Sequence, residues 1–570
     1  MKREREEAAA AGKEERDGAA AIRHCPGLMA HANGGSGDEQ KKAAAAAATR
    51  SNKYDRQLRI WGEHGQGALE QASVCLLNCG ATGSEALKNL VLGGIGNVTA
   101  VDGGLVHESD LGNNFLLSAE NLGQPRAKSM AALLQEMNDS VLIDHIDASP
   151  ESLLDSDPGF FARFTLVIAT QMRDRSLVIL DEVCRRFSVM LLVARSYGLT
   201  GYVRISLREH AVIESKPDNT VSDLRLHRPW PELTTFVEEF NLETEDSLVH
   251  KHIPFAIILL KVCEEWRSKH GGALPSTTKE RSEFKSLVAS KKQAQDEDNY
   301  KEAVAAASKV WSPPSLSSEV KAILEDGAAD VDSSSSDFWI LVAALKRFVA
   351  SEGGGEFPLD GAIPDMHSFT EYYILLQRCY QAKAESDVSA VEAHVRSILS
   401  QLGRDPDSIS RAAIKHFCKN SRNLRVLRYR SLAEELGLKE VGAKLQKYLP
   451  FEGDNTNYAI YLMFRAVDRF AEEFGRFPGA MADETVEEDA AKVGAIAHKL
   501  AGEIGLDGGV SEELVYEFCR FGGGEIHCVG AVVGGIASQE AIKLVTKQFT
   551  PTAGTLIYNA ISSTTTIFQL

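Results

Sequence analysis

Hydrophobic and polar positions change their spacing along the chain, and the first clear change predicts an α/β unit. An uninterrupted apolar run at residues 74–77 predicts a buried strand. After a glycine-containing turn, apolar residues recur on one helical face until Gly93 and Gly94 end the helix. A second apolar run, residues 98–101, ends in Asp102. This order predicts the βαβ unit of a nucleotide-binding α/β sheet.

The remaining strand patterns lie before and after a long middle section. Short apolar runs between turn residues predict strands at residues 166–168, 190–193, 202–206, 556–558 and 564–568. Residues 212–214 are predicted to form a short strand that pairs with 202–206 across a turn. Small apolar residues at 529–535 come before a helix predicted at 538–545. We expect a mixed sheet, parallel first and antiparallel later.

The middle section has the spacing of helices, which predicts an α/β domain split by an insertion. The first part of that domain is expected at residues 51–248, the mainly helical insertion at 249–505 and the last part at 506–570. Residues 1–50 place an alanine run among charged residues. Such a segment cannot bury enough apolar area to offset the entropy of ordering, so we expect a disordered tail.

Composition and charge argue against several classes of partner. The 570 residues carry a formal net charge of -18, which argues against a nucleic-acid groove lined by Lys and Arg. The nine cysteines include no Cys-x-x-Cys pair, so we expect no metal site and no secreted disulfide framework. No apolar run looks long enough to span a bilayer, and the amino terminus lacks the apolar core of a secretory signal. We expect no membrane partner and a reducing compartment.

The turn after the first strand is an incomplete phosphate loop. A dinucleotide fingerprint needs glycines for the tight turn, for close approach to phosphate and for helix packing. Here Asn78 holds the first glycine position, and Ala81 follows Gly80. The turn can therefore bind phosphate or simply join strand to helix, and the spacing leaves both interpretations open.

Three motifs make a family resemblance specific. Residues 54–62 read Tyr-Asp-Arg-Gln-Leu-Arg-Ile-Trp-Gly and resemble the opening motif of the ubiquitin-activating superfamily. Residues 89–102 are similar to its first βαβ unit, and residues 534–543 resemble its closing Gly-Gly-x-Ala-x-Gln-Glu helix. Their order along the chain implies a Rossmann-like adenylation fold of the ThiF/MoeB type.

The chain departs from active members of that superfamily at the positions that handle ATP. Gly104 replaces the second acidic residue after the strand, Asn113 replaces a phosphate-pairing arginine, and Gln171 replaces the aspartate that helps to hold magnesium. Arg126 stands where active members have lysine. A magnesium-bound triphosphate needs carboxylate ligands and fixed cations. We therefore expect a pseudo-active domain that binds neither ATP nor magnesium.

Further segments resemble one branch of the superfamily. Residues 195–202, 214–219, 223–226 and 430–435 look like the regulatory subunits of heterodimers that activate Nedd/RUB-type ubiquitin-like modifiers, in particular the plant auxin-resistant type. The resemblance implies a catalytic partner subunit that holds ATP, Mg and the thioester-forming cysteine. It also implies binding of the modifier, a further contact with its conjugating enzyme, a role in cullin modification, and a location in cytoplasm and nucleus.

The resemblance implies one catalytic residue in this chain. It implies no catalytic role for the cysteines. The arginine of the Tyr-Asp-Arg motif, here Arg56, is expected to reach in trans into the partner's ATP site. Cys263, Cys379 and Cys418 in the insertion are expected to be structural thiols. Residues 534–543 and 364–380 are the expected partner contacts.

Four alternatives stay open at this point. Arg56 could instead form a surface ion pair, and Arg59, one turn further, could be mistaken for it. The chain could serve another modifier such as SUMO, or adenylate a substrate by itself. It could also be an oxidoreductase in which Asp102 holds the ribose of a nicotinamide cofactor.

Overall fold

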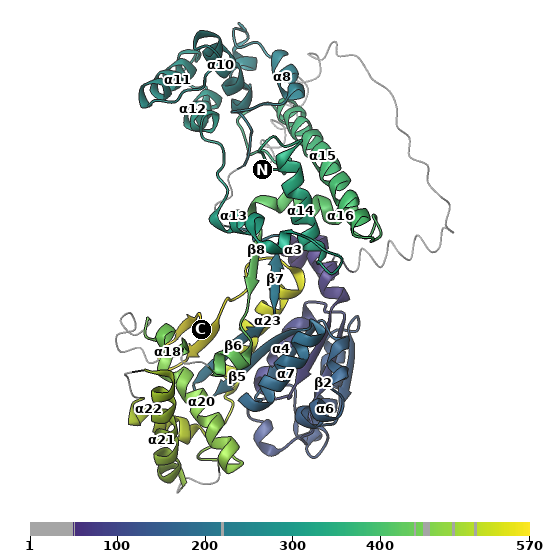
Figure 1. Ribbon diagram of the computed structural model, residues 1–570, viewed down its shortest axis with the longest axis vertical. Coiled ribbons are helices and arrows are strands. Elements are labelled where there is room, and N and C mark those ends of the chain that lie inside the picture. The colour runs from purple at the N-terminus through teal and green to yellow at the C-terminus, as the bar shows by residue number, and fades with distance from the viewer. Residues whose placement is uncertain are drawn as a thin grey trace, which may run out of the picture. The chain divides into compact units, whose positions relative to one another are not determined.

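An eight-stranded mixed sheet forms the centre of the fold (Figure 1). Its strand order is β10-β9-β6-β5-β4-β1-β2-β3. The strands are β1 Ser73–Leu77, β2 Asn97–Val101, β3 Leu142–Ile146, β4 Leu166–Thr170, β5 Met190–Tyr197, β6 Thr200–Ser206, β9 Thr555–Asn559 and β10 Thr564–Phe568. Strands β1 to β5 pair in parallel, while β6, β9 and β10 add antiparallel strands beyond β5. The expected mixed sheet is therefore confirmed.

The computed structural model describes residue 50 and residues 52–570, apart from 218–221, 438–439, 448–456, 481–484 and 507–509. The tail expected at residues 1–50 lies outside the described residues, except for residue 50. Residues 56–570 form one unit, to which the following description applies.

One strand prediction was wrong, and one strand was missed. The prediction that residues 212–214 pair with β6 fails, because β5 and β9 occupy both edges of β6. Of this segment only Val212 lies in a strand, β7 Glu209–Val212, which pairs with β8, Arg425–Arg428, in a separate two-stranded sheet, and Glu214 forms an isolated bridge with Gln548. Strand β3 was not predicted, because it is the edge strand and its first residue, Leu142, is 72% exposed.

Helices cover both faces of the large sheet, and each face has its own apolar core (Figure 1). Val74 and Leu76 of β1 pack on one side, while Cys75 and Leu77 pack on the other, as the period of two in a strand requires. The helices in the first part of the chain are α3 Asp55–Gln71, α4 Ala81–Leu92, η1 Glu108–Asp110, η2 Ala119–Asn121, α5 Arg126–Met137, α6 Pro150–Ser156, η3 Pro158–Arg163 and α7 Asp174–Phe187.

The middle section is mainly helical and has two further cores. Its helices are α8 Pro231–Glu238, α9 Ser247–His250, α10 Phe255–Lys269, α11 Thr278–Ser290, α12 Asp298–Ala306, η4 Ala307–Val310, α13 Ser318–Glu325, η5 Gly327–Ala329, α14 Asp337–Ala350, α15 Thr370–Gln401, α16 Arg411–Asn420 and η6 Ser421–Asn423. Helices α17 Leu432–Gly437, α18 Glu440–Leu445, α20 Asn457–Phe474, α21 Val486–Ile504 and α22 Glu512–Phe521 follow.

Helices α17, α18, α20, α21 and α22 do not belong to the cores of the middle section. Their buried residues, such as Phe464 and Phe518, share one core with Tyr197 of β5. The domain boundaries at residues 248 and 505 stay predictions, but this packing joins residues from 432 onwards to the sheet.

Helix α23, His527–Thr546, packs closely against α4. The two separate segments expected at 529–535 and 538–545 form this single helix. A Cβ atom at Gly534 would lie 2.7 Å from the Cβ of Glu85, so only glycine allows the approach. Among the described residues, α23 is the helix that is long and apolar enough to cross a membrane by length and composition, contrary to our expectation. Half of its most apolar stretch is buried inside the protein, in the core that also contains residues of α4.

Candidate functional site

The loop between β1 and α4 has the shape of a phosphate loop without its first glycine. Asn78 has a φ of 66°, a left-handed conformation that asparagine tolerates better than most residues. Its Nδ2 donates to the carbonyl oxygen of Thr170 at 2.8 Å, and the Thr170 hydroxyl donates to the Asn78 carbonyl at 2.8 Å. Asn78 is thus a turn residue that ties β1 to β4.

The anion position at the N-terminus of α4 is taken by a carboxylate from the same chain. Glu525 accepts hydrogen bonds from the backbone nitrogens of Ala81 and Thr82, at 3.2 and 3.1 Å. It also accepts from the hydroxyls of Thr82 and Ser196, at 2.7 and 3.1 Å. Free N–H groups at a helix N-terminus favour anions, and here the anion is Glu525. Sequence reasoning missed Glu525, because 444 residues separate it from Ala81.

The replaced ATP-handling residues lie around this loop and bond within the chain. Asn113 Nδ2 donates to the backbone oxygen of Glu525 at 3.1 Å. Gln171 Nε2 donates to the backbone oxygen of Ser196 at 2.6 Å. Neither residue supplies a carboxylate or a cation. The structure therefore brings together the positions that the sequence singled out, but the groups present do not fit a magnesium-bound triphosphate.

Asp102 also forms its hydrogen bonds and its ion pair within the chain. Its Oδ2 accepts from the backbone nitrogen of Cys79 at 2.8 Å and pairs with Arg126 Nη1 at 3.1 Å. Its Oδ1 accepts from the backbone nitrogen of Gly104 at 2.7 Å. A ribose held by Asp102, as the oxidoreductase alternative requires, would have to displace these bonds.

Arg56 lies near the start of α3 and is exposed. No hydrogen bond or ion pair joins its side chain to another residue in the described part of the chain, so the alternative of a surface ion pair finds no partner there. The segment after it is anchored: Lys216 Nζ donates to the Ile60 carbonyl at 2.6 Å, and Gln548 Nε2 to the Trp61 carbonyl at 2.9 Å. Hydrogen bonds to the rest of the fold therefore hold the backbone in place shortly after Arg56.

Comparison with known proteins decides the family. The model of the ThiF family matches residues 54–570. This chain belongs to the ThiF family.

This ThiF chain is similar over most of its length to several proteins named NEDD8-activating enzyme E1 regulatory subunit. It is 54% identical over 515 residues to the NEDD8-activating enzyme E1 regulatory subunit AXL of Arabidopsis thaliana, covering 90% of this chain and 98% of the relative. It is 53% identical to the subunit AXR1 of the same plant, covering 91% and 96%. The subunit of Xenopus laevis is 44% identical, with 91% and 99% covered. The chain therefore belongs to the NEDD8-activating enzyme E1 regulatory subunits, and the SUMO alternative is not favoured.

The three cysteines expected to be structural lie in helical surroundings of this ThiF chain. Cys263 and Cys418 are buried, and Cys379 is half-buried. Burial raises the pKa of all three thiols, that of Cys418 to about 12. A thiol that stays protonated at neutral pH is a poor acyl acceptor.

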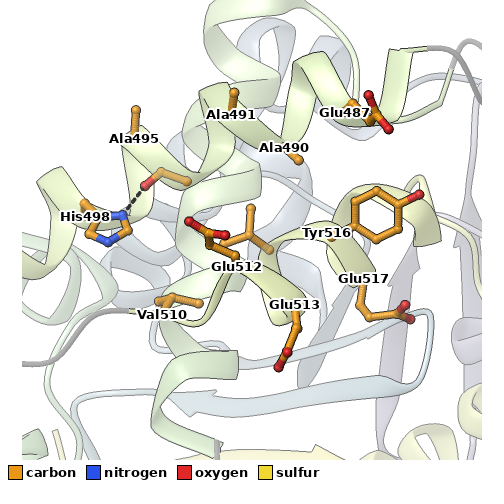
Figure 2. A pocket seen from close by; sticks show the side chains of 12 residues that line it. Glu487, Ala490, Ala491, Ala495, His498, Val510, Glu512, Glu513, Tyr516 and Glu517 are labelled. Carbon is orange, nitrogen blue, oxygen red and sulfur yellow. Dashed lines mark hydrogen bonds between the residues drawn. The ribbon is translucent and has the colours of Figure 1, made fainter.

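A hollow of about 720 Å³ lies between α21 and α22, outside the loop region (Figure 2). Four glutamates take part in its lining: Glu487, Glu512, Glu513 and Glu517. Small apolar residues of α21 lie beside Tyr516 in the same hollow. Because like charges repel, these carboxylates disfavour the phosphates of a nucleotide, so the hollow is no substitute for the closed loop.

Proposed function

We propose that this chain is the non-catalytic member of a heterodimeric activating enzyme for a NEDD8-type modifier. The catalytic partner subunit would hold ATP, magnesium and the thioester-forming cysteine. The observation that carries the proposal is the Glu525 carboxylate, which fills the anion position of this chain's own loop. Gly104, Asn113 and Gln171 add no charged group that could replace the lost ligands.

The reaction to which the chain contributes has two steps. A carboxylate oxygen of the modifier's C-terminal glycine attacks the α-phosphorus of ATP, and pyrophosphate leaves. The partner's thiolate then attacks the acyl carbon, and AMP leaves as the thioester forms. Neither step needs a nucleophile from this chain.

Arg56 is the residue that we propose acts in the first step. Negative charge builds up on the α-phosphate, and a planar guanidinium supplied from another subunit can neutralise it. The exposure of Arg56 and the anchoring of Ile60 and Trp61 support this role. A catalytic group supplied in trans makes adenylation depend on assembly.

We propose that the partner covers a patch beside the closed loop, here called the α23 edge patch and formed by Phe115 and Ile526. Both are exposed apolar side chains. Phe115 lies beside His527, the first residue of α23, with 6.2 Å between the ring centroids. The earlier candidate, residues 534–543, buries Ala537 and other apolar residues inside this chain.

A charged substitution tests the α23 edge patch. Ile526→Glu should weaken assembly with the catalytic subunit in size-exclusion chromatography, because the partner would bury an unpaired charge. Leu142→Glu is the control, since Leu142 is also an apolar side chain, is more exposed than Ile526 (72% against 40%) and lies on the edge strand β3. Equal assembly of both variants would refute the patch.

Pyrophosphate exchange tests the proposed function as a whole. This chain alone, the catalytic subunit alone and the mixture are each supplied with ATP, magnesium and modifier. We expect exchange at full rate only in the mixture, and a thioester only on the partner in non-reducing gels. Exchange by this chain alone would show that it is a self-sufficient adenylating enzyme instead.

A further inference from the structure

We propose that the hollow between α21 and α22, here called the α21–α22 groove, docks a lysine- or arginine-rich amphipathic helix of another protein. The groove is formed by the face of α21 from Glu487 to His498, by Val510 and by the stretch of α22 from Glu512 to Glu517. It shares no residue with the loop between β1 and α4. The inference therefore goes beyond the proposed function and does not rest on it.

One face of α21 is open toward the groove. From Glu487 to His498 the helix rises by about 16 Å, or about three turns. The lining residues between these two ends recur at the spacing of a single helical face, and all of them are small: Ala490, Ala491, Gly494 and Ala495. The opposite face carries Val493 and Leu500 into the core that α21 shares with the sheet. Small side chains on the outer face let a second helix approach closely.

The groove also offers apolar and aromatic contacts. Val510 and Val515 line it and are almost wholly buried, whereas the side chain of Tyr516 is 43% exposed. Figure 2 shows the alanines of α21 along one wall, and Tyr516 with the glutamates of α22 along the other. Such surfaces can cover the apolar face of a docked helix, and the ring face of a tyrosine attracts an ammonium or guanidinium group.

The charges around the groove are almost all negative. Four glutamates are among its described lining residues, and no lysine or arginine is. Arg520 pairs with Glu517, but no ion pair joins the side chains of the other three to any residue in the described part of the chain. His498 Nδ1 donates to the Gly494 carbonyl at 2.7 Å, within α21 itself (Figure 2). Unpaired carboxylates beside an apolar surface complement a helix that has basic side chains along its apolar face.

The same charges disfavour other occupants. Nucleic acid and anionic lipid headgroups would be repelled by the glutamates. A divalent cation needs several ligands that converge on one point, and no group of three His, Cys, Asp or Glu side chains in the described ranges could hold a metal ion. A helix without basic residues would leave the carboxylates unpaired. A basic amphipathic helix matches both the apolar surface and the charge.

A purely structural explanation accounts for part of this charge. Glu487, Glu512 and Glu513 lie in the first turns of their helices, where a carboxylate stabilises the N-terminal end. That explanation predicts that replacing them lowers helix stability and leaves the affinity for any peptide unchanged. Docking predicts that peptide affinity follows the charge of the groove. The two explanations are separated by measuring peptide binding.

Fluorescence anisotropy with the purified full-length chain provides the measurement. The probe is a labelled synthetic helix with leucine and alanine on one face and lysine on the other. It is compared with a scrambled peptide of the same composition and with a peptide that has glutamate in place of lysine. The groove variant, Glu487→Gln with Glu512→Gln, removes one carboxylate from each helix. The matched control, Glu238→Gln with Glu239→Gln, removes two exposed carboxylates at the end of α8.

We expect the wild-type chain to bind the lysine helix more tightly than the scrambled peptide. The groove variant should bind it on the order of tenfold more weakly, because two ion pairs are lost, and the control should bind it like wild type. Glu487→Lys with Glu512→Lys should lose the lysine helix and gain the glutamate helix. Equal weakening in the groove variant and the control, or equal binding of the ordered and scrambled peptides, would overturn the proposal.

Two further measurements test the position of the docked helix. Ala495→Arg places a long cationic side chain on the α21 wall and should weaken binding of the lysine helix, whereas Ala412→Arg at the exposed start of α16 should not. Equal effects of these two variants would contradict docking in the groove. Binding is also measured after assembly with the catalytic subunit, and we expect it to be retained. Loss of binding on assembly would mean that the catalytic subunit itself covers the groove, which would overturn the proposal.

Discussion

Replacing Asp468 by asparagine removes the carboxylate that pairs with the buried guanidinium of Arg195. In the folded chain, Arg195 Nη1 and Nη2 donate to the two carboxylate oxygens of Asp468 at 2.6 and 2.8 Å. The two side chains are only 3% and 1% exposed. The pair joins β5 of the sheet to α20. Removing one partner of a buried ion pair costs ~3–5 kcal/mol, because the other charge stays desolvated.

Hydrogen exchange of peptides from α20 measures this loss of stability locally. A chain with several cores does not unfold in one step, so a single melting temperature would not isolate the pair. We expect Asp468→Asn to speed exchange in α20 by roughly two to four orders of magnitude. The double variant Arg195→Met, Asp468→Leu should exchange more slowly than Asp468→Asn, because both charges of the pair are removed together.

Asp407→Asn provides the control, because Asp407 pairs with Arg396 on the surface and should leave α20 unchanged. The reasoning is refuted if Asp468→Asn changes α20 exchange less than about tenfold, or if α20 in the double variant exchanges as fast as in Asp468→Asn.

Three further predictions rest on other parts of the fold. Gly534→Val should sharply lower the yield of folded chain, because a Cβ there would lie 2.8 Å from a backbone oxygen of α4; Gly535→Val, with no atom within 4 Å, is the control and should behave like wild type. Iodoacetamide should label exposed Cys528 of the native chain long before buried Cys418, and equal labelling by peptide mass spectrometry would contradict the packing. Burial, then the charge of Lys547, lowers the pKa of His210 from 6.5 to about 4, so local stability should fall as pH drops through that window; His210→Gln should flatten this part of the pH profile of hydrogen exchange in β7 peptides, corrected for intrinsic exchange rates, and an unchanged profile would refute it.

The first βαβ unit could be predicted because its signals are local. Strand β1, the turn at Asn78 and helix α4 follow one another within about twenty residues, and each has its own pattern of apolar and turn residues. The same local reasoning identified β4, β5, β6, β9 and β10. Edge strand β3 was missed because it lacks a continuous apolar run, and a half-exposed strand resembles a loop in sequence.

The pairing of β7 and the closing of the loop could not be predicted, because both depend on residues far apart in the chain. Strand β7 pairs with β8 more than two hundred residues later. Glu525 reaches Ala81 across 444 residues, and the glycines before it were the sole sequence signal of an unusual turn. The sequence indicated which charged groups are missing around the loop. The structure adds which group takes their place.

Adenylation by a reconstituted heterodimer that carries Arg56→Ala tests the central claim most directly. We expect normal assembly and a loss of pyrophosphate exchange on the order of tenfold or more, within the ~1–4 kcal/mol of one transition-state charge contact. Arg59→Ala, one helical turn away in α3, should have the smaller effect. An unchanged exchange rate in a fully assembled Arg56→Ala complex would contradict the account and leave this subunit without a part in the chemistry.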